Sequence, residues 1–395
     1  GRYTTENNYG TLGTVAPTNI QLNNLKWEKV EKIDVGLDFS FLEDRLNFNV
    51  DYYRNTTHDL LQKNISVASY IGYTSIPFIN SGKMRNEGWE FRGSYNDILK
   101  SNVWKLGLNF NISGNQNKLL ELPQNVNYMQ YPDQATNGEY AITLEAGDPM
   151  GSFYGFRYLG VYKDEAATYV HDANGNLVYD ISGQPARMYH EDRQVRPGDA
   201  IYQDVNGDGI INKHDIVYLG NSMPKVTAGF GFNVGYKQLM LRAFFHSRWK
   251  YDVVNQARMN AENMSGYDNQ SVSVRNRWRF EGDETNIPRA LHKGANHYNW
   301  LGSDRFVEDA SFIRLKQLSL SYNLPKRMLK NLGLSKLSIA ATAYDLFTWT
   351  KYSGQDPEVD IRGGMTNAGK FQVMGVDNAK TPRPRKIMIG INLEF

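Results

Sequence analysis

The sequence predicts an all-β chain, and within that class an antiparallel β-barrel that crosses a membrane. Apolar side chains recur at every second position in many short segments, the last segment ends on an aromatic residue, and short connections alternate with long polar ones. The mean hydropathy is -0.56, and no run of about 18 apolar residues is present. Membrane strands carry apolar side chains only at alternate positions, so these low averages are compatible with a barrel.

The last ten residues give the strongest signal. One face of a strand over residues 386–395 would carry Ile387, Ile389, Ile391, Leu393 and Phe395. A tilted strand of about 9–11 residues crosses a bilayer, and this segment has that length and one apolar face. Its final Phe resembles the assembly signal of outer-membrane proteins. Taken alone, the segment is also compatible with the last strand of a soluble sheet.

The same alternation predicts a series of hairpins, roughly ten strands in all. Two strands meet at a Glu43-Asp44 turn, and two others meet at residues 236–238. The predicted strands cover residues 33–41, 46–52, 89–95, 104–112, 226–234, 239–245, 317–322, 336–348 and 386–395.

The remaining connections are long and polar, at about residues 114–149, 161–224, 250–307 and 351–383. Barrels in membranes have short turns at one end and long extracellular loops at the other. The face opposite the apolar one would carry Asp34, Asp38, Asn47, Asn49, Asp51, Glu90, Arg92, Lys105, Asn109 and Asn111. Burying these groups in a dry core would be costly, so they predict a wide, watery lumen.

Five segments resemble the SusC/RagA-type TonB-dependent outer-membrane transporters. They read LKWEKVEKIDVGLDF at 25–39, VEDASFIRLK at 307–316, LSYNLP at 320–325, YSGQDPE at 352–358 and PRPR at 382–385. The resemblance extends from about residue 20 to Phe395. It implies a plugged barrel of about 22 strands, of which residues 1–395 supply roughly the C-terminal ten. The plug domain is expected upstream of this chain, which begins at Gly1 without an initiator methionine or signal peptide.

The resemblance also implies a function in the bacterial outer membrane. The whole assembly would import an oligomeric nutrient, a glycan or a peptide, beneath a SusD-like surface lipoprotein, with TonB acting through the plug. Its other partners would be the remaining strands and the surrounding lipid and lipopolysaccharide. A passive porin-like or structural barrel and a secreted calcium-binding β-protein are the alternatives. Substrate contacts are not assigned, although aromatic residues near the loops, such as Trp249, Tyr251 and Tyr298, would either stack on sugars or pack the loops.

One short motif predicts a cation site. Read as a twelve-residue calcium loop, DVNGDGIINKHD at 204–215 places Gly209 at the sharp turn. Its ligands would be Asp204, Asn206, Asp208, the Ile210 carbonyl, Asn212 and Asp215. Asp215 replaces the usual bidentate Glu and has a shorter reach. The alternative is an Asx-rich turn whose side chains bond their own backbone.

Other classes of function find no support in the sequence. The seven histidines lie in no HExxH pattern, and no serine lies in a GxSxG elbow. Asp356 and Glu358 are interpreted as loop carboxylates rather than a glycosidase pair. Net charge is +2 and no basic run is interleaved with aromatics, so no nucleic-acid partner is expected. The chain is therefore expected not to be an enzyme.

Overall fold

The computed structural model describes residues 3–9, 12–17, 25–66, 75–99, 101–122, 128–131, 138–172, 174–292, 298–329, 333–359, 374–379 and 381–394. Strands dominate these residues, and the two α-helices are short, at Gln256–Ala261 (α1) and Lys326–Leu329 (α2). Within the described part of the chain, no helix has both the length and the apolar character needed to cross a membrane.

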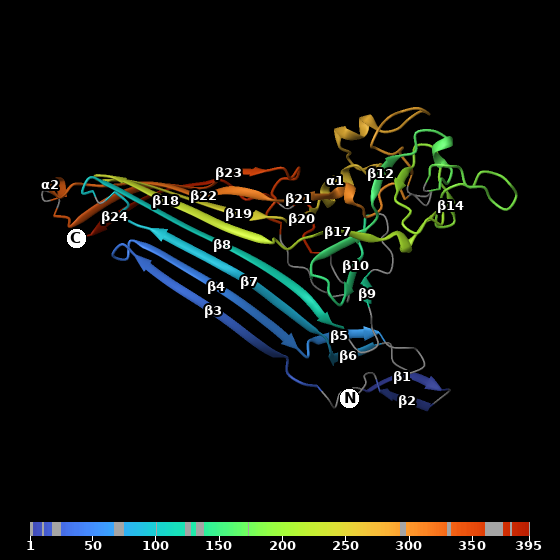
Figure 1. Cartoon of the computed structure of the whole chain (residues 1–395), viewed down its shortest axis with the longest axis horizontal. Helices are drawn as coiled ribbons and strands as arrows, with labels where there is room; N and C mark the ends of the chain where they lie inside the picture. Colours follow the sequence, from blue (N-terminus) through green and yellow to red (C-terminus); the bar gives the residue numbers. More distant parts are fainter. Residues whose placement is uncertain are drawn as a thin grey trace.

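Nine strands form one antiparallel sheet in which each strand pairs with the next along the chain (Figure 1). In chain order they are β3 (Lys29–Phe41), β4 (Leu46–His58), β7 (Lys83–Tyr95), β8 (Trp104–Glu121), β18 (Val226–Tyr236), β19 (Leu239–Trp249), β22 (Phe312–Asn323), β23 (Lys336–Thr350) and β24 (Lys386–Glu394). Every strand predicted from the alternation lies in this sheet. The prediction of an antiparallel barrel wall is therefore confirmed.

The sheet has one end with short turns and one end with long connections. At the turn end, β3 and β4 are joined through Leu42, Glu43 and Asp44, all with positive φ, and Lys237 (φ 51°) turns the chain between β18 and β19. Both predicted turns are confirmed. The opposite end, called here the loop end, receives the connections between β4 and β7, between β8 and β18, between β19 and β22, and between β23 and β24.

One face of the sheet is apolar across its whole width. Because directly paired residues share a face, the register defines rows that run across the strands. One row contains Val50, Phe91, Ile112, Ala228, Ser247, Ile313 and Trp349, and the next contains Phe48, Gly93, Phe110, Phe230, Phe245, Leu315 and Phe347. On β24, Ile387 and Ile389 are each 76% exposed. These two isoleucine side chains are not packed inside a protein core, so they are free to face lipid.

Two aromatic rows border this apolar face. Tyr52, Trp89 and Trp249 lie in a row toward the loop end, and Trp104, Tyr236 and Tyr322 lie in a row toward the turn end. On β8 the two rows are separated by ten residue steps, about 33 Å of strand. A tilt of about 40° converts this length into a band about 25 Å tall, the height of the apolar belt of membrane barrels.

The other face of the sheet is polar. One of its rows contains Asp38, Asn49, Arg92, Asn111, Gly229, His246, Arg314 and Thr348, and the next contains Ser40, Asn47, Ser94, Asn109, Gly231, Phe244, Gln317 and Tyr344. All ten side chains predicted to point into a lumen lie on this face. We call it the lumenal face.

The long connections contain short strands and turns packed at the loop end of the sheet (Figure 1). These elements are β9 (Tyr128–Tyr131), β10 (Ile142–Glu145), β11 (Ser152–Gly155), β12 (Tyr158–Val161), β13 (Tyr189–His190), β14 (Arg193–Gln194), β15 (Ala200–Tyr202), β16 (Ile210–Ile211), β17 (Val217–Asn221), β20 (Asp252–Val254) and β21 (Val307–Asp309). Four 3-10 helices, η2 (Ala166–Thr168), η3 (Lys213–Asp215), η4 (Val272–Asn276) and η5 (Asp304–Phe306), accompany them. Two separate hairpins pair β1 (Tyr3–Tyr9) with β2 (Leu12–Pro17) and β5 (Leu61–Ser66) with β6 (Ser75–Asn80).

The described residues within 138–221 and 251–310 form a packed unit, called here the loop module. It has its own buried side chains, including Phe153, Phe156, Tyr202, Met259 and Phe306. The expected loop at 114–149 begins later than predicted, because β8 continues to Glu121. Parts of the expected loops at 114–149, 250–307 and 351–383, and Phe395, lie outside the described residues.

Candidate functional site

Polar side chains on the lumenal face bond to one another across the strands. Asn49 Nδ2 donates to Asp38 Oδ1 at 2.5 Å, and Asn115 Nδ2 donates to the Tyr53 hydroxyl at 2.6 Å. On β18, a Cβ at Gly231 would lie 2.2 Å from Asn109 Oδ1. Glycine at this position therefore gives the amide of the neighbouring strand its space. The face is a hydrogen-bonded polar wall suited to contact with a watery passage.

At the loop end of this wall, Arg314 of β22 forms the centre of a buried ion cluster. Its side chain is 3% exposed and forms an ion pair with Asp356 and another, at 3.1 Å, with Glu358. Arg248, Lys316 and Arg383 also reach Glu358, at 3.4, 3.3 and 3.2 Å. These ion pairs fix the segment 351–359 to β19 and β22. We call this cluster the Arg314 clasp.

The clasp was not predicted from the sequence, although the segments 307–316, 352–358 and 382–385 that form it are among those that resemble the transporter family. Burial by itself would raise the pKa of Asp356, but the Arg314 guanidinium and the backbone N–H groups of Glu358 and Arg383 together hold that pKa below its ordinary range. Both carboxylates thus pair with the same arginine. This arrangement agrees with the interpretation of Asp356 and Glu358 as loop carboxylates.

The predicted calcium ligands lie together in one turn of the loop module. Asp204 accepts the backbone N–H groups of Gly207 and Gly209, both at 2.7 Å, through its two carboxylate oxygens. Asn206 Oδ1 accepts from the Asp208 N–H at 3.1 Å, and Asp208 Oδ1 accepts from the Ile210 N–H at 2.8 Å. Asn212 caps η3 by accepting from His214 N–H. These contacts are those of an Asx-rich turn.

Asp215 connects two parts of the turn through its carboxylate. Its two oxygens accept from Val205 N–H and Asn212 N–H, each at 2.8 Å, and the residue is fully buried. Burial raises the pKa of Asp215, the backbone N–H groups of Asn212 and Val205 oppose this shift, and the carboxylates of Asp204 and Asp208 add to it. Among the described residues, no group of three His, Cys, Asp or Glu side chains converges as metal ligands do. A metal here would therefore also need the amide and carbonyl oxygens of the predicted set.

The donor set nevertheless suits a hard cation. All of its side-chain donors are oxygens, and an oxygen that accepts one N–H keeps a further lone pair for a metal. Over the described part of the chain, no lysine, arginine or histidine forms an ion pair with Asp204, Asp208 or Asp215. The three carboxylates are left without a neutralising partner.

The aromatic residues expected in the loops have different environments. Tyr251 and Tyr298 are buried, with 2% and 3% exposure, and pack inside the loop module. Trp249 is the last residue of β19 and belongs to the outer aromatic row. Packing therefore accounts for Tyr251 and Tyr298, and Trp249 borders the apolar face of the sheet.

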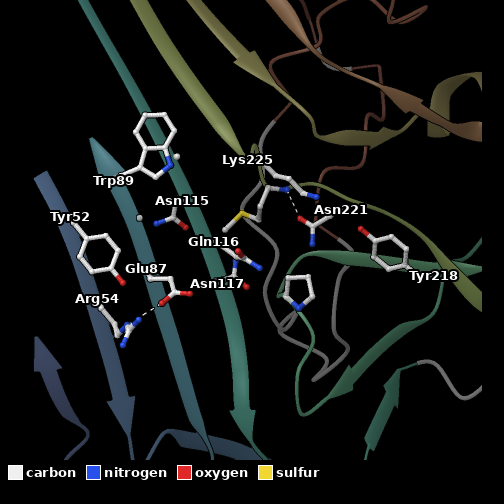
Figure 2. A pocket seen from close by; sticks show the side chains of 14 residues that line it. Tyr52, Arg54, Glu87, Trp89, Asn115, Gln116, Asn117, Tyr218, Asn221 and Lys225 are labelled. Atoms are coloured by element: carbon white, nitrogen blue, oxygen red, sulfur yellow. Dashed lines mark hydrogen bonds and ion pairs between the residues drawn. The ribbon is translucent and has the colours of Figure 1, made fainter. Parts of the chain in front are cut away.

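A hollow of about 440 Å³ lies where the sheet meets the loop module (Figure 2). The sheet contributes Tyr52, Trp89 and the ion pair between Arg54 Nε and Glu87 Oε2 at 3.1 Å. The facing segment contributes Tyr218 and other residues up to Lys225. The hollow begins at the upper border of the apolar belt, where aromatic side chains meet charged ones.

The loop module also contains a partly buried histidine whose titration is expected to lower the stability of the module in acid. His190 stacks on Tyr298, with ring centroids 4.2 Å apart, and burial lowers the pKa of His190 to about 4 from an ordinary 6.5. Between these values only the unfolded chain takes up the proton. The neutral His190 therefore contributes its full stabilisation to the folded module above about pH 6.5. This contribution falls as the pH drops toward 4, and the free energy of unfolding is lower by about 2 kcal/mol at pH 5.

Hydrogen exchange of the module at pH 7 and pH 5, corrected for intrinsic rates, measures this loss. His190→Phe keeps an aromatic ring beside Tyr298 but cannot be protonated, so its loss should be much smaller. The exposed His214 serves as the control position, and His214→Gln should behave as the unchanged protein. An acid response that is the same in His190→Phe would exclude His190 as its source.

Comparison with known proteins gives consistent matches. The family model described as TonB dependent receptor-like, beta-barrel, matches residues 2–196. "TonB-dependent receptor P3" of Formosa agariphila is 30% identical over 384 residues, covering 96% of this chain and 35% of that protein. "TonB-dependent receptor SusC" of Bacteroides thetaiotaomicron is 26% identical over 390 residues, covering 94% and 32%.

Among solved structures, the fold matches a chain of the RagAB peptide transporter with a TM-score of 0.73 and 24% sequence identity. The match covers 100% of this chain and 38% of that one. The chain therefore spans about a third of the length of the proteins that it matches.

Proposed function

Because this chain is a section of a TonB-dependent receptor-like β-barrel of the SusC and RagA type, we propose that it forms part of the wall of an outer-membrane nutrient importer. The complete protein takes up an oligomeric glycan or peptide with a SusD-like surface lipoprotein, and TonB drives opening through a plug. The importer belongs to the bacterial outer membrane.

The observation that carries this proposal is the two-faced sheet. An apolar band about 25 Å tall covers one face, and a hydrogen-bonded polar wall covers the other. Since β3 and β24 each have a single neighbour among the described strands, and since open sheet edges are not tolerated in hydrocarbon, we infer that further strands complete the barrel. Such a wall separates lipid from a wide passage.

Uptake by living cells tests the proposal. Cells that express the complete receptor should accumulate labelled oligosaccharides or oligopeptides, and loss of TonB or of the neighbouring lipoprotein should abolish that accumulation. Parallel glycan and peptide pools would identify the substrate class. Uptake that persists without TonB would instead support a passive porin-like barrel. A receptor that stays monodisperse without detergent would support a secreted β-protein.

We also propose that the turn at 204–215 binds calcium and stabilises the loop module. With a dissociation constant of about 10⁻⁵–10⁻⁴ M, calcium at about 1 mM adds about 2 kcal/mol to the stability of the module. Asp208→Asn keeps an oxygen for the Ile210 N–H but removes one charge, so it should reduce the gain.

Thermal unfolding of the module with calcium, with magnesium and with a chelator measures the effect. Calcium should raise the unfolding temperature more than magnesium, because the site offers many oxygen ligands in a flexible turn. An identical unfolding curve in calcium and in chelator would leave the loop as an Asx-rich turn without a metal.

A further inference from the structure

Above the apolar belt, the outer face of the sheet carries three rows of charged residues. Moving from Tyr52 and Trp89 toward the loop end, the outward positions of β4, β7 and β8 are no longer apolar. The first row contains Arg54, Glu87 and Gln116, the second contains Glu31, Thr56, Arg85 and Lys118, and the third contains Lys29, His58, Lys83 and Glu121. The strands thus continue beyond the hydrocarbon with a charged outer surface.

Every carboxylate in these rows already has a partner. Glu87 pairs with Arg54 at 3.1 Å, Glu31 lies 3.4 Å from His58, and Glu121 lies 3.8 Å from Lys83. The remaining cations of the second row are Arg85 and Lys118. Among the described residues, neither forms an ion pair with a carboxylate within 4.0 Å.

Arg85 and Lys118 lie directly opposite each other on β7 and β8. Like charges directly opposite across a strand pair are destabilising. The Arg85 Nε is also buried without a hydrogen-bond partner among the described residues, and an unsatisfied charged donor is costly. An anion bound between the two side chains would remove the like-charge penalty, because arginine binds phosphate through its N–H groups and lysine binds it as a point charge.

The height of the pair identifies the source of the anion. Lys118 is four residue steps beyond Gly114 on β8, about 13 Å along the strand and about 10 Å above the aromatic row after tilt. This height corresponds to headgroups rather than to acyl chains. On the side of the pair that faces the apolar belt, Trp89 and Tyr52 border the hollow (Figure 2). A molecule bound here would place a phosphate on the cations and its chains on the belt.

We propose that Arg85 and Lys118 form a binding site for the phosphate of an outer-leaflet glycolipid. This proposal rests on the proposed outer-membrane location of the barrel. It adds a specific lipid contact on the outer wall, separate from the passage that nutrients would use.

The test uses the complete receptor in neutral detergent, titrated with fluorescent diphosphoryl lipid A and with its dephosphorylated form. The unchanged receptor should bind the phosphorylated lipid about tenfold more tightly or better, as expected for a charge-assisted contact. Arg85→Gln with Lys118→Gln should remove that preference. Arg92→Gln, a change of the same kind on the lumenal face, should retain it.

Each other outcome would overturn the proposal. These outcomes are an unchanged preference in the double variant, no preference in the unchanged receptor, or full displacement by millimolar inorganic phosphate, which would assign the site to free phosphate. Lys118→Gln alone provides a milder change should the double variant not fold, because Lys118 is exposed. Failure of the importer proposal would appear separately, as uptake that does not depend on TonB.

Discussion

Replacing Leu108 with arginine is expected to destabilise the receptor in a bilayer by about 2–4 kcal/mol, the cost of a cationic side chain on the lipid face near the midplane. Leu108 lies on β8 between Tyr95 and Phe232, in one of the rows between the two aromatic borders. Its neighbours in the row are apolar, so the guanidinium would have no polar partner at that depth. Unfolding in guanidinium chloride with the receptor in lipid vesicles measures the change.

The next residue on the same strand provides the matched control. Asn109 points to the lumenal face, between Ser94 and Gly231, two small neighbours that leave room for a longer side chain. Asn109→Arg is therefore expected to change stability by less than about 0.5 kcal/mol. Leu108→Ala separates the lost apolar contact from the added charge. If both arginine variants lost the same stability, the assignment of the two faces would be wrong.

Strand positions were predictable because the alternation persists across the bilayer. A strand with lipid on one side and water on the other alternates apolar and polar residues. β18 does so along its length, and β19 and β24 do so at most positions, with exceptions such as Met240, Phe244 and Met388. The extensions of β4, β7 and β8 toward the loop end were missed for the same reason. There both faces are polar, so Arg85, Glu87 and Lys118 give no periodic signal.

The loop module could not be predicted in the same way. Its core is assembled from strands of two to five residues that contribute only a few buried side chains each, such as Phe153 on β11 and Tyr202 on β15. Segments of that length are too short to establish a period. Composition therefore indicated polar loops, although the chain folds into a unit with its own core.

In the candidate site, too, contacts between residues close in the sequence were predicted, and contacts between distant residues were missed. The motif at 204–215 was found because its residues are adjacent in the sequence, and they do lie in one turn. The Arg314 clasp joins a strand to residues more than forty positions away. No spacing rule connects such residues, and the resemblance to a family indicated their segments without indicating the contact.

The clasp is expected to contribute more than any other single cluster to the position of the segment 351–359. Arg314→Ala would leave Asp356 without its guanidinium and would remove one of four cations from Glu358, which has a side-chain exposure of 9%. Removing one partner of a buried ion pair typically costs about 3–5 kcal/mol, because the remaining charge stays buried and uncompensated. The segment should therefore detach from β22 before the sheet unfolds.

Hydrogen exchange can follow this detachment at named groups. The Glu358 N–H donates to Asp356 Oδ1 at 2.9 Å, and the Ser353 N–H donates to Glu308 Oε2 at 2.9 Å. In Arg314→Ala the exchange at Glu358 should accelerate more than at Ser353, since Glu308 keeps its own partner Arg258 at 2.9 Å. Arg92→Ala is the control, because its ion pair with Glu90 is solvent-exposed and should contribute less than about 1 kcal/mol.

A second variant separates the charge from the packing. Arg314→Met combined with Asp356→Asn and Glu358→Gln removes the buried cation together with both of its anions. Of the other cations at Glu358, Lys316 keeps its ion pair with Asp345 at 3.2 Å, whereas the partly exposed Arg248 and Arg383 lose theirs. Much of the stability lost in Arg314→Ala should return, since neutral replacements of buried ion clusters are often tolerated. If the triple variant were as unstable as Arg314→Ala, packing of the arginine side chain, and not its charge, would hold the segment.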